Sequence, residues 1–227
     1  MFRIGYMRLR DQHVSTIDLV WKRDLRGYRI EAPKAWTPSR HVIIGQTRPS
    51  ARLFPIGGKL VTCNPVEQFD RLFIEFGNVK TPEGLGAFAN RFGPLTAAGN
   101  DASRGESVDM LLEQAQHMKR LSEPLKRQRG AGPMLAGPTG FLGRVEVSLA
   151  LDQHLRSILR FTVPDLLTAL WLQFGQAMSG GVEMRSCQRC NALFQVGPGH
   201  RRRDATFCSP GHKRDHFSLL RGSKVNA

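Results

Sequence analysis

The chain has 227 residues, of which 41% are hydrophobic, so it can bury the core of one large domain or of one domain plus a small module. Its formal net charge of +14 indicates a polyanionic partner such as nucleic acid or an anionic membrane surface, with a basic but otherwise ordinary protein as the alternative. The sequence has no run of 18 apolar residues that would suggest a membrane span. The opening MFRIGYMRLRDQH also lacks the apolar run of a secretory signal. We therefore expect a cytoplasmic protein without a membrane partner.

Short strands are expected first along the chain. β-Rich runs at 16–22 and 27–32 are separated by RDLR, which predicts a hairpin, and further strands are expected at 41–46 and 59–63. Cys63 ends the last of these runs, and we expect it to be a small buried apolar residue.

Helical periodicity follows. Apolar spacing predicts helices over 65–77 and over 81–93, the second capped by Thr81 and stopped by Gly93. A third begins at 106 and should end or kink near Ser122, because Pro124 cannot continue it. The phenylalanines in these runs are expected in the core rather than in a binding site.

A strand pair and one more helix complete the predicted body. The alternating run RVEVSLALD (144–152) can pair with 157–163, and the following helix should bury one face made of Leu167, Leu170, Trp171 and Phe174. Gly180 and Gly181 end it. The pattern therefore predicts an α+β body over 1–180, which senses a signal or forms a homodimer, and a separate module over 181–227.

Three of the four cysteines lie in the stretch CQRCNALFQVGPGHRRRDATFCSPGH, which ends in a histidine. Cys187 and Cys190 have the spacing of a zinc knuckle, and Cys208 and His212 have the i, i+4 spacing that places two side chains on one side of a helical turn. Clustered cysteines in a chain without a secretory signal indicate metal binding rather than disulfides. The sequence therefore predicts one Zn²⁺ held by these four residues.

The predicted module is a treble-clef zinc finger. A knuckle is followed by a hairpin that pairs 192–196 with 204–207, and then by a helix that begins at Ser209 and Pro210 and closes at Gly222. His216 and His200 are the alternative fourth ligands. Four protein ligands leave no open position for water, so metal catalysis is not expected.

Positive charge is concentrated in this module. Residues 185–227 hold nine lysines or arginines and two aspartates, a formal net charge of +7 and thus half of the total. Zinc would fix a basic hairpin tip relative to a basic helix, as phosphate binding requires. A solvated charged surface is the alternative interpretation. The predicted nucleic-acid contacts are Arg201, Arg202, Arg203, Lys213, Arg214 and Arg221.

The stretch CQRCNALFQV…RRRDATFCSPGHKRDHF resembles the CGNR-type zinc fingers of bacterial transcription regulators. The segments LLTALWLQFGQAMSGG and TPEGLGAFANRFGPLT are similar to parts of bacterial proteins that carry such a finger at the C-terminus. The resemblance implies zinc at Cys187, Cys190, Cys208 and His212 and a DNA-binding role. His212 stands where the family has its last cysteine, and HKRD replaces the Cys-Gly-Asn-Arg signature.

Three functions are compatible with these patterns. The leading hypothesis is a DNA-binding transcription regulator without enzymatic activity, with DNA preferred to RNA as the partner. The second is a zinc-stabilised module that docks another protein. The third is a nuclease of the ββα-metal type, which needs an open metal site and a base such as His200. We find no phosphate-binding loop, because GPGHRRR does not lead from a strand into a helix.

Overall fold

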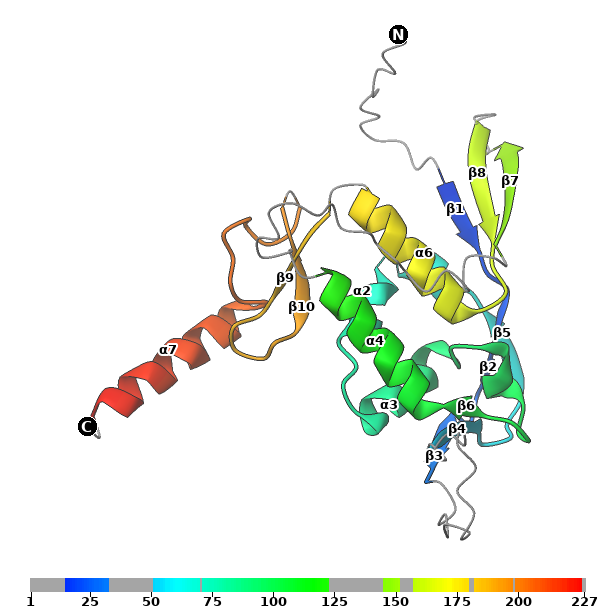
Figure 1. Cartoon of the computed structure of the whole chain (residues 1–227), viewed down its shortest axis with the longest axis horizontal. Helices are drawn as coiled ribbons and strands as arrows, with labels where there is room; N and C mark the ends of the chain where they lie inside the picture. The colour runs from blue at the N-terminus through cyan, green and yellow to red at the C-terminus, as the bar shows by residue number, and fades with distance from the viewer. Residues whose placement is uncertain are drawn as a thin grey trace, which may run out of the picture.

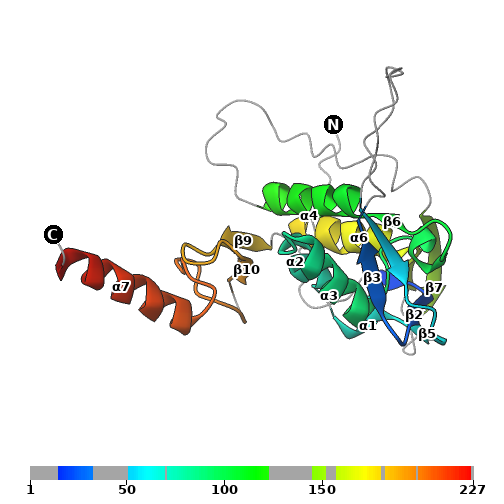
Figure 2. The same cartoon turned by 90° about the horizontal axis from the view of Figure 1, so that it is seen from below.

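The computed structural model describes residues 15–32, 51–69, 71–122, 145–151, 157–179, 182–197 and 199–225. Within these residues the protein is a mixed α+β structure, in which a central group of helices is flanked by small sheets (Figure 1). The C-terminal helix extends away from this body in both views (Figures 1 and 2). In the described part of the chain, no helix combines the length and apolar character needed to cross a membrane.

The strands are short, and most pair with partners distant in the sequence. In one sheet, of order β1-β8-β7, β1 is parallel and β7 antiparallel to β8. A second has the order β3-β4-β6, while β2 pairs with β5 and β9 with β10. The bounds are β1 Ser15–Asp18, β2 Trp21–Asp24, β3 Tyr28–Glu31, β4 Arg52–Pro55, β5 Leu60–Cys63, β6 Glu106–Ser107, β7 Glu146–Leu151, β8 Ser157–Thr162, β9 Glu183–Ser186 and β10 Leu193–Val196.

The hairpin predicted between 16–22 and 27–32 is wrong, since β2 and β3 pair with β5 and β4 instead of with each other. Asp24 explains the difference. Its buried carboxylate accepts hydrogen bonds from the backbone N–H groups of Arg26, at 2.8 Å, and of Gly57, at 2.7 Å. The turn after β2 is thereby tied to the turn between β4 and β5.

Of the other strand predictions, some are confirmed and one lies outside the described residues. The strand at 59–63 is confirmed as β5, and the antiparallel pair of 144–152 with 157–163 is confirmed as β7 and β8. The strand expected at 41–46 lies outside the described residues. Cys63 packs against the core but is only half-buried.

The helix predicted over 65–77 is two helices, α1 and α2, separated by a break at Phe69. At the break the Phe69 ring packs edge-on against Phe92, with 5.2 Å between centroids, and the Phe69 carbonyl accepts a hydrogen bond from Gln173. The helix bounds are α1 Pro65–Gln68, α2 Leu72–Gly77, α3 Pro82–Phe92, a short 3₁₀ turn η1 Ala97–Asn100, α4 Val108–Ser122, α6 Leu166–Ser179 and α7 Pro210–Val225.

The remaining helices predicted for the body are present, with two qualifications. The helix predicted from 106 begins at Val108, because Glu106 and Ser107 pair with β4 as β6. The predicted stop at Gly180 and Gly181 lies outside the described residues. Thr81 caps α3 by accepting a hydrogen bond from the Gly84 N–H, and Gly93 ends it with a φ of 96°, which suits glycine. Helices α2, α3, α4 and α6 enclose the main core, and the expected apolar face of α6 is buried. The phenylalanines of α2, α3 and α6 lie inside this core, so they are structural.

The β9–β10 hairpin contacts the body directly, and β10 lies beside α2 (Figure 1). Met184 and Leu193 are buried in the main core. The Asn78 side chain donates to the Leu193 carbonyl at 3.0 Å and accepts from its N–H at 2.6 Å. One face of the hairpin is therefore part of the body's core, and the other face carries the cysteines.

Candidate metal centre

The CxxC motif forms the turn of the β9–β10 hairpin. The Cys187 N–H donates to the Ala192 carbonyl at 2.9 Å, and the Asn191 N–H donates to the Cys187 carbonyl at 2.8 Å. Asn191 has a φ of 57°, a left-handed conformation that asparagine tolerates better than most residues. This tight turn presents the Cys187 and Cys190 thiols from a single short segment.

The hairpin predicted between 192–196 and 204–207 is wrong. β10 pairs with β9, which precedes the knuckle, and beyond β10 only an isolated bridge joins Val196 to Arg201 in the described residues. Gly197 and Gly199 both have positive φ values, which turn the chain into a loop. We call residues 199–204 the tip loop; it returns the chain to the metal centre.

Helix α7 supplies the histidine. Ser209 caps it by accepting a hydrogen bond from the His212 N–H at 3.1 Å, and Pro210 is its first residue. His212 consequently lies in the first turn, one turn after Cys208. The predicted start is confirmed, but the predicted end at Gly222 is wrong, because the helix continues to Val225.

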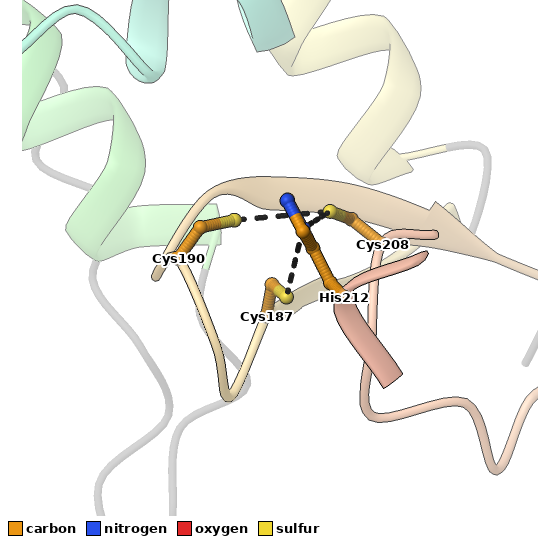
Figure 3. A group of neighbouring side chains, drawn as sticks. All are labelled: Cys187, Cys190, Cys208 and His212. Atoms are coloured by element: carbon orange, nitrogen blue, oxygen red, sulfur yellow. Dashed lines mark hydrogen bonds between the residues drawn. The ribbon is translucent and has the colours of Figure 1, made fainter. Parts of the chain in front are cut away.

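The four predicted ligands converge (Figure 3). Their ligand atoms lie within 4.8 Å of one another. The Cys190 and Cys208 sulfurs are 3.8 Å apart, and His212 Nδ1 is 3.9 Å from the Cys187 sulfur and 3.0 Å from the Cys208 sulfur. Tetrahedral zinc would separate two sulfurs by about 3.8 Å and a sulfur from a nitrogen by about 3.6 Å. The cluster thus forms a Cys3His set able to hold a metal ion.

The alternative histidines lie elsewhere. The His216 ring packs against Phe207, with 5.2 Å between centroids, and against Phe217. His200 is exposed on the tip loop beside Arg71. Among the described residues, His212 is therefore the histidine that joins the three cysteines.

The thiols influence one another electrostatically. Burial raises the pKa of Cys187, but hydrogen bonds from the backbone N–H groups of Cys208, Cys190 and Arg189 outweigh this effect and lower it to about 6. Burial and the two neighbouring thiols raise the pKa of Cys208 to about 12. A thiolate at Cys187 thus disfavours a second thiolate at Cys208 by charge repulsion, and a bound divalent cation would offset that repulsion.

A small apolar cluster surrounds the sulfurs. Cys187, Phe194, Val196 and Phe207 are its buried members, and Cys190 and Cys208 pack against it. The body holds the knuckle from outside, because the Lys80 and Lys119 ammonium groups donate to the carbonyls of Cys190 and Asn191. The sequence could not reveal these two lysines, which belong to segments 110 and 72 residues away.

The six predicted nucleic-acid contacts are exposed, and five of them line two surfaces. The first lies around a groove of about 480 Å³ between the tip loop and the start of α7, whose lining includes Arg201, Arg202 and Lys213. The second lies along α7, where Lys213, Arg214 and Arg221 share one surface with Phe217 and Ser218, two residues that the sequence analysis did not single out. Arg203 is exposed but lines neither surface, and Arg202 forms an exposed ion pair with Asp204.

No protein-family model, no curated protein and no solved structure matches this chain. Its class is therefore defined by the fold and the site alone: an α+β protein with a Cys3His metal-binding site in its C-terminal region.

Proposed function

We propose that the protein binds zinc through Cys187, Cys190, Cys208 and His212 and uses the basic surface around that site to bind DNA, as a transcription regulator. The observation that carries this proposal is the position of the metal ligands. They join the knuckle to the first turn of α7, and the tip loop spans the interval between them. A metal held there would fix the two basic elements relative to each other.

The donor set supports zinc as the metal. Three thiolates and one imidazole are soft to borderline ligands, which favour Zn²⁺ over Mg²⁺ or Ca²⁺. Such a site is closed, because the protein supplies all four ligands. We therefore propose a structural role for the metal and no catalytic one. The position of His200, on the tip loop beside Arg71, argues in the same direction, since a nuclease would need its base at the metal.

Charge and shape support nucleic acid as the partner. Half of the protein's net charge lies in the last 43 residues. Helix α7 has 16 residues, about 24 Å in length, and it extends away from the body (Figure 2). A helix of this kind fits the major groove of DNA, where basic side chains contact phosphates and base edges.

Two exposed apolar side chains favour the protein-docking alternative. Phe217 is 43% exposed and Leu219 is 59% exposed, both on α7. Single exposed apolar residues are common on protein surfaces. The concentration of positive charge therefore carries more weight, and DNA binding is the preferred proposal.

The tip loop provides the test. Changing Arg201, Arg202 and Arg203 together to Ala should weaken the binding of a DNA duplex and lower the slope of log affinity against log salt by about three units, about one for each phosphate contact. Zinc content and melting temperature should stay nearly unchanged, because exposed charges add little to stability. The readout is fluorescence anisotropy at several salt concentrations.

A matched control is available on the body. Arg29, Arg104 and Arg160 are exposed arginines that each form an ion pair with a carboxylate, so changing all three to Ala removes the same formal charge. This control should retain most of the wild-type affinity. If the tip-loop variant binds as tightly as wild type at physiological salt, DNA contact through the tip loop is wrong and protein docking becomes the better proposal.

A further inference from the structure

A second groove lies on the other side of the tip loop, between this loop and the start of α2. It has a volume of about 440 Å³, and its cationic lining residues are Arg71, directly before α2, and Arg201. Its lining also includes Ile74, Leu193 and Phe194. No residue that lines this groove in the described part of the chain is acidic.

Arg71 has an unusual partner. Its Nη1 atom lies 2.5 Å from Nε2 and 3.2 Å from Nδ1 of His200. A guanidinium has only donors, so the imidazole must accept and His200 is neutral in this contact. Burial and the Arg71 charge lower the pKa of His200 accordingly. Two other arginines of the described chain, Arg23 and Arg52, donate to backbone carbonyls. Several more form ion pairs with carboxylates: Arg29, Arg91, Arg104, Arg160, Arg185 and Arg202.

The acidic residue of α2 is already engaged. Glu75 lies one helical turn after Arg71, and its carboxylate accepts from Arg91 at 3.0 Å. The guanidinium of Arg71 therefore faces a groove that offers it a neutral imidazole. An anion entering the groove would give the Arg71 guanidinium an oppositely charged acceptor in place of this neutral one.

The two walls of the groove are held together by the body–hairpin contacts. Asn78, just after α2, makes two hydrogen bonds to the backbone of Leu193 in β10. Lys80 and Lys119 hold the knuckle at the end of the same hairpin. The end of α2 and the β9–β10 hairpin are thus parts of one packed structure, and the Arg71–His200 contact joins the tip loop to it.

The second groove adjoins the one between the tip loop and α7, because His200 and Arg201 line both. Cationic side chains accordingly form one path across the two grooves: Arg71 lines the groove at the body, Arg201 lines both, and Arg202 and Lys213 line the groove at α7 together with Asp204. We infer that this path binds one phosphodiester backbone of a DNA duplex and that Arg71 contributes a phosphate contact from the body. Arginine suits this role because its planar fork can bind two phosphate oxygens at once.

This inference rests on the proposed function, and its test separates the two. The full-length, zinc-loaded protein is titrated with a DNA duplex at several salt concentrations. Arg71→Gln should weaken binding several-fold and lower the salt slope by about one unit. Arg71→Lys keeps the charge and should keep the slope. Arg29→Gln is the matched control and should behave like wild type.

His200→Ala separates a phosphate contact from a purely structural role of Arg71. It removes the contact between the tip loop and Arg71 but leaves the Arg71 charge in place, so a phosphate contact predicts the wild-type salt slope. A purely structural role predicts that His200→Ala weakens DNA binding as Arg71→Gln does. If Arg71→Gln also keeps the wild-type slope while wild type binds DNA, the inference is overturned and the proposed function stands. If wild type does not bind DNA, both are overturned.

A second measurement avoids substitution altogether. An arginine-specific dicarbonyl reagent is applied to the wild-type protein, and modification at Arg71 is followed by peptide mass spectrometry. Bound duplex should slow the modification of Arg71 and leave Arg29 unaffected. Equal rates at Arg71 with and without bound duplex would overturn the inference, even if Arg71→Gln failed to fold.

Discussion

The molecule has two clusters of buried side chains: the main core of the body, which includes Met184 and Leu193 of the β9–β10 hairpin, and a smaller cluster around the C-terminal cysteines. The main core gathers leucines, phenylalanines and other apolar residues from α2, α3, α4, α6 and several strands. The C-terminal cluster has four buried members, Cys187, Phe194, Val196 and Phe207. So few apolar side chains cannot offset the entropy of ordering the knuckle, the tip loop and α7. The comparison shows that apolar burial stabilises the body, whereas the C-terminal region places a Cys3His set able to hold a metal ion where the body has apolar side chains; we propose that the metal stabilises this region.

The largest effect is expected from the metal ligands. Cys187→Ser or Cys208→Ser should abolish stoichiometric zinc binding, because each removes one of the four proposed ligands. The effect should be large, since structural zinc contributes on the order of 10 kcal/mol to the folding of such modules. Elemental analysis of the purified variants measures this loss. Cys63→Ser is the matched control and should keep its zinc, since Cys63 lies in β5 and outside the cluster.

The two histidines of α7 sharpen the same prediction. His212→Ala should weaken zinc binding, whereas His216→Ala should not, because the His216 ring packs on Phe207. Full zinc occupancy in both cysteine variants would contradict the ligand assignment. Weaker zinc binding in His216→Ala than in His212→Ala would assign His216, instead of His212, as the fourth ligand.

An intermediate effect is expected from removing the C-terminal region. A chain ended at residue 180 loses Met184 and Leu193, which are 2% and 3% exposed in the main core. Burying one such side chain contributes about 1.5–3 kcal/mol. The shortened body should therefore keep a cooperative thermal transition at a lower temperature. A fragment without a cooperative transition would show instead that the two regions fold as one unit.

The smallest effect concerns Glu106, a buried residue of the body. Burial raises its pKa to about 7, although the backbone N–H groups of Leu95 and Thr96 donate to its carboxylate. The folded protein therefore holds a proton that the unfolded chain releases above its ordinary pKa of 4.5. The resulting stabilisation is present below pH 4.5 and is lost as the pH rises through 7; it amounts to about 3 kcal/mol at most.

Chemical denaturation of wild type and of Glu106→Gln across this pH range measures the effect. The free energy of unfolding of wild type minus that of Glu106→Gln should fall as the pH rises from 4.5 to 7. Loss of metal at acid pH affects both proteins and cancels in the difference. A constant difference across this range would contradict the assignment.

The metal cluster could be predicted from the sequence because its information is local. The CxxC spacing defines a tight turn, and the Cys208–His212 spacing with a serine cap defines the start of a helix. The amphipathic helices of the body were predictable for the same reason, apart from the break at Phe69. That break depends on Phe92 and Gln173, which are distant in the sequence.

Strand pairing was much less predictable, since it depends on distant partners. β1 pairs with β8, more than a hundred residues later, and the buried Asp24 redirects β2 and β3 through the Gly57–Gly58 turn. β10 pairs with the short strand before the knuckle, although 204–207 looked a suitable partner. The contacts of Lys80, Lys119 and Arg71 with the C-terminal region also arise only once the chain has folded.

The most direct test of the central claim compares DNA affinity with and without the metal. The wild-type protein is stripped of metal with a chelator, titrated with a DNA duplex by fluorescence anisotropy, and then measured again after one equivalent of zinc is added. We predict that chelation leaves the body helices folded by circular dichroism, weakens DNA binding by at least tenfold, and that zinc restores it. If the stripped protein binds with the same affinity and salt slope as the zinc-loaded protein, the metal does not organise the DNA-binding surface and the account is wrong.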